Sequence, residues 1–150
     1  MKKLFSIVLC SLLVFCLVGC SYKNDFDIGE ISDIEILNRD VELVIKEGSL
    51  SNVGAVLILK NNSDTSITYG TPYEIEINKD GKWYKINVEL YFIMPAFELK
   101  PGEEKEIELD WEYGYGKLAK GEYRIIKDYT ENVESDEYKK LYVACEFVIE

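Results

Sequence analysis

Alternation between apolar and polar side chains dominates this chain from about residue 41 to its end. A period of two residues is the spacing of a β-strand that buries one face. The clearest runs are residues 41–45, 73–78, 84–90, 106–111, 123–126 and 141–149, and residues 55–59 form a continuous apolar run. We expect that run to be a strand covered on both faces or at the centre of the fold. After residue 20, no long apolar stripe has the 3.6-residue period of a helix. The sequence therefore predicts an all-β domain of about seven strands.

Turn residues separate these runs. Asp80-Gly81 lies between two of them, and this dipeptide favours a tight hairpin because both residues tolerate positive φ. Residues 61–64 form a polar cluster, Pro101-Gly102 precedes the fifth run and Lys120-Gly121 precedes the sixth. Short turns between strands favour two antiparallel sheets packed face to face. A small open barrel is the alternative.

The N-terminal stretch has a different character. Lys2 and Lys3 precede an apolar run over residues 4–18, which is too short for a comfortable membrane span and ends in Leu17-Val18-Gly19-Cys20. This ending resembles the lipobox of bacterial lipoproteins. The resemblance implies a signal peptide over residues 1–19 that is cleaved, and a lipid on the thiol of Cys20. The protein would then be anchored at the extracytoplasmic face of the cell membrane. An ordinary secretory signal or an N-terminal anchor helix is the alternative.

Residues 20–37 are predicted to be the lipidated cysteine and a flexible acidic tether, and residues 38–150 to be the domain. The net charge of the chain is −11, and loss of the two leader lysines would make it −13. Such a surface repels nucleic acid and anionic headgroups. We therefore expect the domain to stand off the membrane, with an unidentified protein partner and no nucleic-acid partner.

The segment Leu118-Ala119-Lys120-Gly121-Glu122-Tyr123 has the pattern of a tyrosine corner. In Greek-key sandwiches the tyrosine hydroxyl of this motif bonds back to the backbone near the preceding turn. We expect Tyr123 to make this bond, so its role is structural.

The order of the motifs resembles that of the bacterial immunoglobulin-like domain found in lipoproteins of low-GC Gram-positive bacteria. The motifs are Asn61-Asn62-Ser63, Tyr69-Gly70-x-x-Tyr73-x-Ile75-Glu76, Gly81-x-Trp83-Tyr84, Leu99-x-Pro101-Gly102-Glu103, Asp110-Trp111 and Tyr115-Gly116-x-Leu118-x-x-Gly121-x-Tyr123-Arg124. The resemblance covers residues 38–150 and implies an immunoglobulin-like β-sandwich. It carries over no catalytic residue. A similar layout occurs in the intracellular proteinase inhibitors, which keeps inhibition among the alternatives.

The sequence excludes several kinds of catalytic site and gives only weak support to others. The chain has no histidine, which removes Ser-His-Asp and Cys-His catalysis, and a mature chain would keep only Cys145 besides Cys20. Cys145 alternates with apolar residues and is predicted to be a buried thiol. We expect no catalytic residue, no cofactor and no metal. Carboxylate-based chemistry is formally open. Five acids at outward strand positions are interpreted as a solvated sheet face: Glu74, Glu76, Glu106, Glu108 and Asp110.

Two regions remain as candidate binding sites. An acidic loop over residues 128–137 has oxygen ligands that suit calcium, although its spacing matches no EF-hand and a plain acidic connection is favoured. Aromatic side chains beside acids make good contact surfaces, and the candidates are Trp111, Tyr113, Tyr115 and Trp83. A structural role is favoured over a binding site, because Trp111 falls on the predicted core face and Tyr115-Gly116 belongs to the turn motifs that carry the family resemblance. An apolar stretch with Tyr91, Phe92, Met94 and Phe97 is expected to cover an open end of the sandwich or to present a partner patch.

The sequence favours a cell-envelope lipoprotein that carries a non-catalytic interaction or structural module. An inhibitor or regulator of an extracytoplasmic protease or wall hydrolase is the second hypothesis. A carboxylate-based carbohydrate-active enzyme is the third.

Overall fold

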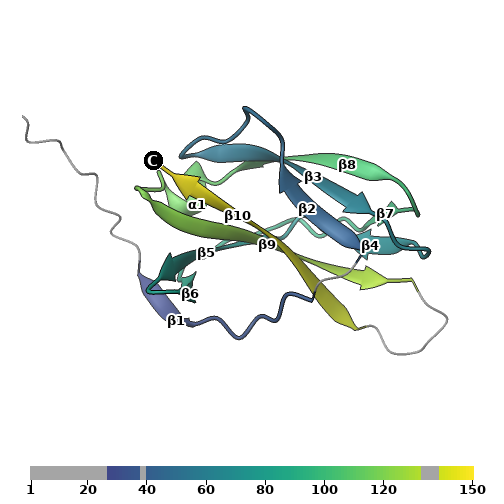
Figure 1. The fold of residues 1–150 in the computed structure, drawn as a ribbon, viewed down its shortest axis with the longest axis horizontal. Helices are drawn as coiled ribbons and strands as arrows, with labels where there is room; N and C mark the ends of the chain where they lie inside the picture. Colours follow the sequence, from purple (N-terminus) through teal and green to yellow (C-terminus); the bar gives the residue numbers. More distant parts are fainter. Residues whose placement is uncertain (1–26, 38–39, 133–138) are drawn as a thin grey trace, which may run out of the picture.

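The fold is made almost entirely of strands (Figure 1). The computed structural model describes residues 27–37, 40–132 and 139–150. Its elements are β1 (Ile28–Ile31), β2 (Val41–Ile45), β3 (Gly54–Asn61), β4 (Ile67–Tyr69), β5 (Glu74–Lys79), β6 (Lys82–Ile86), β7 (Phe97–Leu99), β8 (Glu104–Asp110), α1 (Glu112–Tyr115), β9 (Gly121–Glu131) and β10 (Lys140–Ile149). The strands β1, β4 and β7 were not predicted, because three or four residues are too few to show an alternation.

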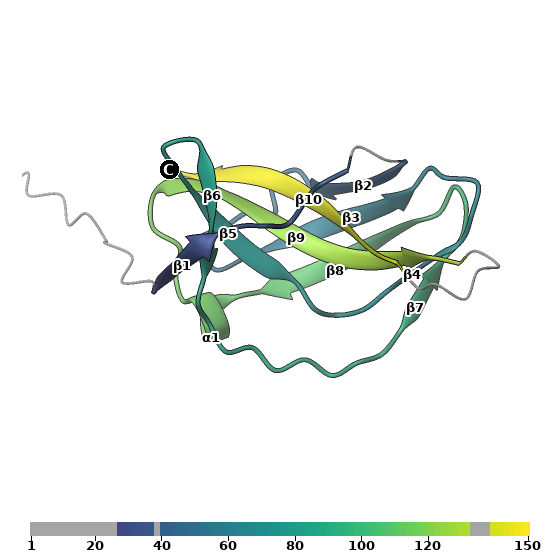
Figure 2. The same ribbon diagram turned by 90° about the horizontal axis from the view of Figure 1, so that it is seen from below.

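Two antiparallel sheets pack face to face, as predicted (Figures 1 and 2). In the larger sheet the long strand β9 pairs with β10 along one edge and with both β5 and β4 along the other. This sheet continues from β5 through β6 to β1, and from β4 to β7. The second sheet has the order β2-β3-β8. The all-β sandwich predicted from the alternation is thus confirmed.

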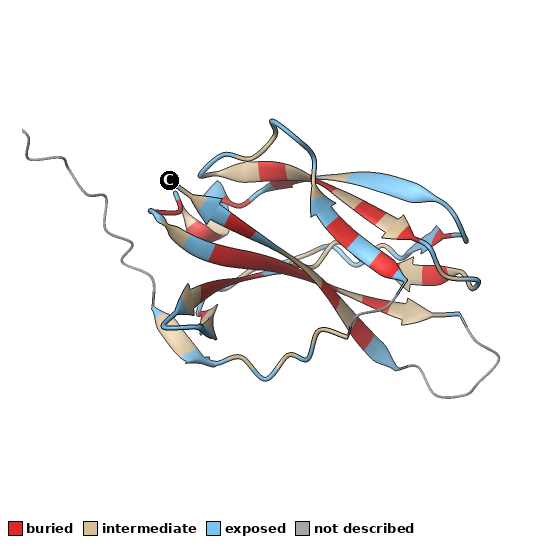
Figure 3. Cartoon of the chain, in the orientation of Figure 1, coloured by how far each residue is buried: buried red, intermediate tan, exposed pale blue. Residues whose placement is uncertain are grey.

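The core fills the space between the two sheets. Its most buried side chains come from both layers and include Leu57, Ile75, Tyr123, Ile125 and Trp111. The apolar run of residues 55–59 lies in β3, the central strand of the smaller sheet, but only its alternate residues are buried. The outer face of the smaller sheet is therefore not covered. Of the two alternatives for residues 55–59, the strand covered on both faces is wrong and the central strand is correct. The longest buried stretch is instead in β9, which is red over most of its length in Figure 3.

Turn chemistry follows the sequence. Asp80 and Gly81 have φ of 54° and 77° and join β5 to β6 as a two-residue hairpin, with Lys79 opposite Lys82. Such a loop needs positive φ at both positions to match the twist of the strands. The predicted Asn61 turn is organised by a buried side chain, whose Nδ2 donates to Thr65 O at 2.8 Å and to Leu99 O at 2.9 Å.

The predicted tyrosine corner has the expected geometry. The hydroxyl of Tyr123 donates to Ala119 O at 2.9 Å, and its ring is fully buried and stacked on Phe147. The bond ties the loop after α1 to the start of β9.

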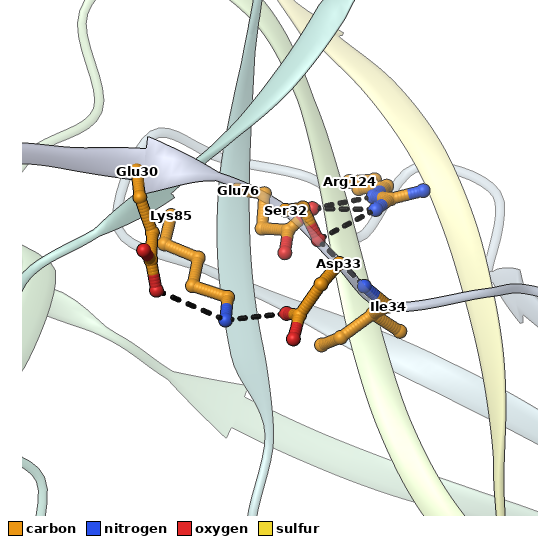
Figure 4. A network of polar contacts seen from close by, with 7 residues as sticks. All are labelled: Glu30, Ser32, Asp33, Ile34, Glu76, Lys85 and Arg124. Atoms are coloured by element: carbon orange, nitrogen blue, oxygen red, sulfur yellow. Dashed lines mark hydrogen bonds and ion pairs between the residues drawn. The ribbon is translucent and has the colours of Figure 1, made fainter.

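Part of the segment predicted to be a flexible tether is ordered. Ile28 to Ile31 form β1, an edge strand antiparallel to β6, with a register irregularity between its two ends. Residues 32–37 then run across the outer face of the larger sheet on the way to β2 (Figures 1 and 4). We call residues 32–37 the strap. The tether prediction failed for residues 28–37 because short-range sequence features do not reveal pairing with a distant strand.

Candidate functional site

A cluster of charged side chains lies beneath the strap on the outer face of the larger sheet (Figure 4). Arg124 of β9 donates from Nε and Nη2 to one oxygen of Glu76 on β5, at 2.7 Å each. Both side chains are buried, with 9% and 1% of their surface exposed. Their strands are direct neighbours, and Glu76 is opposite Arg124 in the ladder. The pair therefore joins two central strands through a charge-assisted bond in a water-poor place.

The strap and the hairpin close over this pair. Arg124 Nη2 donates to Ser32 Oγ at 3.2 Å, and the guanidinium carbon lies 4.9 Å from the ring centre of Trp83. The backbone N–H of Ser32 donates to Trp83 O at 2.9 Å. The guanidinium is thus held by a carboxylate, a hydroxyl and an aromatic face. The second oxygen of Glu76, Oε1, is buried and has no hydrogen-bond partner among the residues that the structure describes.

A second set of charges fixes the outside of the strap (Figure 4). Lys85 of β6 contacts Asp33 Oδ1 at 2.6 Å and Glu30 Oε1 at 3.8 Å. The bond from Lys85 lowers the pKa of the Asp33 carboxyl and raises the pKa of the lysine. Because both acids are largely exposed, these contacts guide the strap and add little stability.

A polar cavity of about 430 Å³ lies beside this cluster. Its walls are the strap, the first residues of β10, and the side chains of Glu74, Lys85 and Lys140. Partial burial raises the pKa of Glu74, and the charge of Glu76 adds to that effect. Lys140 is paired with Asp128 at 3.0 Å, and that bond raises its pKa. The cavity carries charges of both signs, so its chemistry suits a small polar ligand with a cationic and an anionic group.

Lys127 is a buried lysine that no feature of the sequence singled out. Its Nζ donates to Gly70 O at 2.9 Å and to Pro72 O at 2.8 Å, so it caps the turn between β4 and β5. Burial lowers its pKa to about 8. Its role is to hold a turn whose carbonyl groups point into the protein.

The predicted aromatic contact surface does not exist as one surface. Trp111 is fully buried, and its indole N–H donates to Asn52 O at 3.0 Å. Tyr115 is buried as well, and its hydroxyl accepts the N–H of Ile75 at 2.9 Å. Tyr113 alone of this trio is exposed, at 99%. Trp83 is half-buried over Arg124. The structural interpretation of Trp111 and Tyr115, which the sequence favoured, agrees with their burial.

Glu76 corrects the interpretation of the outward acids as a solvated sheet face. It does point outward from β5, but the strap and Arg124 cover it completely. One sequence signal could have revealed this cover, since the outward side of β9 carries Ile126 as well as Arg124. An apolar residue at an outward position indicates that something packs on that face. The covering segment itself could not be identified from the sequence.

The remaining candidate regions have mixed outcomes. Cys145 is half-buried, and burial raises the pKa of its thiol to about 12. Of the acidic loop, Asp128 and Glu131 belong to β9, whereas residues 133–138 lie outside the described residues. Within the described part, no group of three or more potential metal ligands occurs. The signal peptide and Cys20 also lie outside the described residues. None of the described helices has the length and apolar character needed to cross a bilayer.

The predicted apolar stretch is exposed. Tyr91, Ile93 and Met94 are 90%, 80% and 81% exposed, and Phe97 is 43% exposed. The stretch does not close an end of the sandwich as a lid, although Phe92 packs inward against Tyr73.

Comparison with known protein families gives one match. Residues 37–141, more than two thirds of the chain, match a family model described as a bacterial Ig-like domain. No curated protein matches the chain.

Proposed function

This chain belongs to the family of bacterial Ig-like domains, and from that membership we propose that it is a non-catalytic contact module held at the outer side of a cell membrane by a lipid on Cys20. Domains of this class act as interaction or structural modules. The envelope location and the lipid anchor do not follow from family membership. They rest on the Leu17-Val18-Gly19-Cys20 ending of the leader.

The proposal that the module is non-catalytic rests on the fact that its buried charged side chains are bonded within the protein. Glu76 and Arg124 bond to each other, and Lys127 bonds to two backbone carbonyls. A catalytic acid, base or nucleophile needs access to a substrate. These three groups instead hold strands, strap and turn in place, so they support a structural role.

The anchor is tested by labelling growing cells with an alkyne analogue of palmitate. We expect the full chain to carry the label and to sediment with membranes, and the Cys20→Ala variant to lose both properties. Cys145→Ala is the matched control, because it removes a thiol that lies in the folded domain. Unchanged labelling of Cys20→Ala would contradict the anchor.

The non-catalytic part is tested at the cavity. Glu74 is the described carboxyl with a raised pKa, so it is the best available candidate for a general acid. We expect no release of reducing sugar from cell-wall polysaccharide between about pH 4 and pH 8. Activity that is present in the wild-type chain and lost in Glu74→Gln would overturn this part of the proposal.

A further inference from the structure

The connection from β6 to β7 contains an exposed, uncharged stretch. Residues 90–96, which we call the apolar loop, contain no charged side chain, although 30% of the whole chain is charged. Tyr91, Ile93 and Met94 are at least 80% exposed. Acids flank the loop at Glu89 and Glu98. Three large apolar side chains in water at one place indicate a contact surface.

The protein holds these side chains outward by fixing the residues between them. Phe92 packs edge to face on Tyr73, with ring centres 5.4 Å apart. Leu90 packs against Gly114, where any Cβ would overlap it. Thr71 Oγ1 donates to Ile93 O at 2.5 Å. Leu90 and Phe92 therefore face the protein, and the backbone geometry turns Tyr91 and Ile93 to the outside.

Lys127 strengthens this support. It caps the carbonyls of Gly70 and Pro72, the two neighbours of Thr71. The turn that binds the apolar loop is thus itself pinned to β9. Exposure of the loop is a property of the folded domain and does not come from a loosely attached segment.

The apolar loop begins three residues after Asn87, which contacts Asp27, the described residue nearest in sequence to Cys20. The backbone N–H of Asn87 donates to Asp27 O at 2.8 Å, and its side chain donates to Asp27 Oδ2 at 3.1 Å. Asn87 is four residues before Tyr91, so their Cα atoms lie within about 14 Å. Asp27 is seven positions after Cys20 in the sequence, a reach of at most about 25 Å. Figure 2 shows the start of β1 and the end of β6 at the same end of the molecule, from which the chain runs along one side to β7.

We infer that the apolar loop inserts into the lipid surface that holds Cys20. This inference rests on the proposed anchor. It replaces the expectation that the whole domain stands off the membrane, because one uncharged loop contacts the lipid while the acidic remainder does not. The site takes the headgroup–acyl boundary of a bilayer: Tyr91 suits the interface, and Ile93 and Met94 suit the outermost acyl region. The ordered β1 shortens the connection that the sequence predicted, and the short connection keeps the loop at high effective concentration near the lipid.

Charge determines the kind of contact. The acidic domain is repelled by anionic headgroups, so the attraction comes from apolar burial at the loop. Insertion is therefore stronger in zwitterionic vesicles than in anionic ones, and salt reduces that difference because it screens the repulsion.

The test uses the full acylated chain in vesicles of phosphatidylcholine with brominated acyl chains, which quench indole fluorescence on contact. The Tyr91→Trp variant places an indole in the loop, and Val44→Trp places one on the outer face of the smaller sheet. The native Trp83 and Trp111 give a background that the wild-type chain measures. We expect about twofold quenching of the new indole at position 91 and almost none at position 44. Adding Ile93→Glu to the Tyr91→Trp variant should abolish the quenching while the chain stays acylated.

The outcomes separate the two proposals. Absence of the acyl label on Cys20 overturns the proposed function. An acylated, vesicle-bound chain whose indole at position 91 is unquenched overturns the inference alone. In native membranes, a protein partner that covers the loop would shield the indole at position 91 from acrylamide. Such cover by a protein in place of lipid would also overturn the inference.

Discussion

Glu76 and Arg124 show at the scale of single residues how a charge pattern acquires its meaning from what covers it. Each is one charged residue at an outward strand position, yet together they form a buried pair under the strap. Such a pair is weak evidence of stability in itself, because both charges lose water. It does make the arrangement of β5, β9 and the strap specific, since any other register would leave a charge alone.

Substituting one partner of the pair should lower the free energy of unfolding much more than substituting both. Arg124→Met leaves the Glu76 carboxylate buried without a partner, and we expect a loss of about 3–5 kcal/mol in the free energy of unfolding. The double variant Glu76→Leu with Arg124→Met should recover most of that loss. Urea titration measures both. The exposed pair of Lys46 and Glu106 is the control, and Lys46→Met should cost less than about 1 kcal/mol. Equal losses of unfolding free energy for Arg124→Met and Lys46→Met would contradict this account.

Lys127 should make stability depend on alkaline pH. Its pKa falls from 10.5 to about 8 in the folded protein. Between these two values the unfolded chain binds more protons, so the contribution of Lys127 to stability rises as the pH rises. The charged lysine costs stability below about pH 8. The difference in stability between the wild-type chain and Lys127→Met should therefore shift in favour of the wild type from pH 7 to pH 10. A difference that is independent of pH would show that the folded pKa is ordinary.

Strand β1 illustrates at the scale of elements how an edge segment can be ordered without being part of the cooperative core. Among the described strands it pairs only with β6, its register is irregular, and exposed ion pairs support it. β9, by contrast, is paired on both edges and buried on both faces.

Native-state hydrogen exchange should separate these two elements. The amides of Ser32 and Asn87 bond across to Trp83 O and Asp27 O. We expect them to exchange at least about 100-fold faster than the β9 amide of Ile125, because β1 opens without global unfolding. Lys85→Gln should speed the exchange of Ser32 further and leave Ile125 unchanged. Equal protection of β1 and β9 would place the strand in the global unfolding unit.

The whole molecule is held by one apolar core between two sheets. In the described residues, Cys145 is free and no cluster of three metal-ligating side chains occurs. Stability should then be independent of chelators and reductants.

This expectation is checked by thermal unfolding with and without EDTA, and with and without dithiothreitol. We expect shifts in Tm below about 2 °C in both cases. A clear fall in Tm with EDTA that added calcium reverses would instead support the calcium alternative for the acidic loop over residues 128–137.

The sequence by itself determined the strands and their turns. Alternation, the Asp80-Gly81 hairpin and the backbone bond of Tyr123 all depend on residues that are close along the chain. Only the tertiary structure decided which candidate surface residues are exposed. Trp111 and Tyr113 lie two positions apart, and one is fully buried while the other is 99% exposed. The strap over Glu76 and the contact between Asn87 and Asp27 belong to the same class. Local periodicity shows which side of a strand a residue is on, whereas its cover is supplied by segments that are remote in sequence.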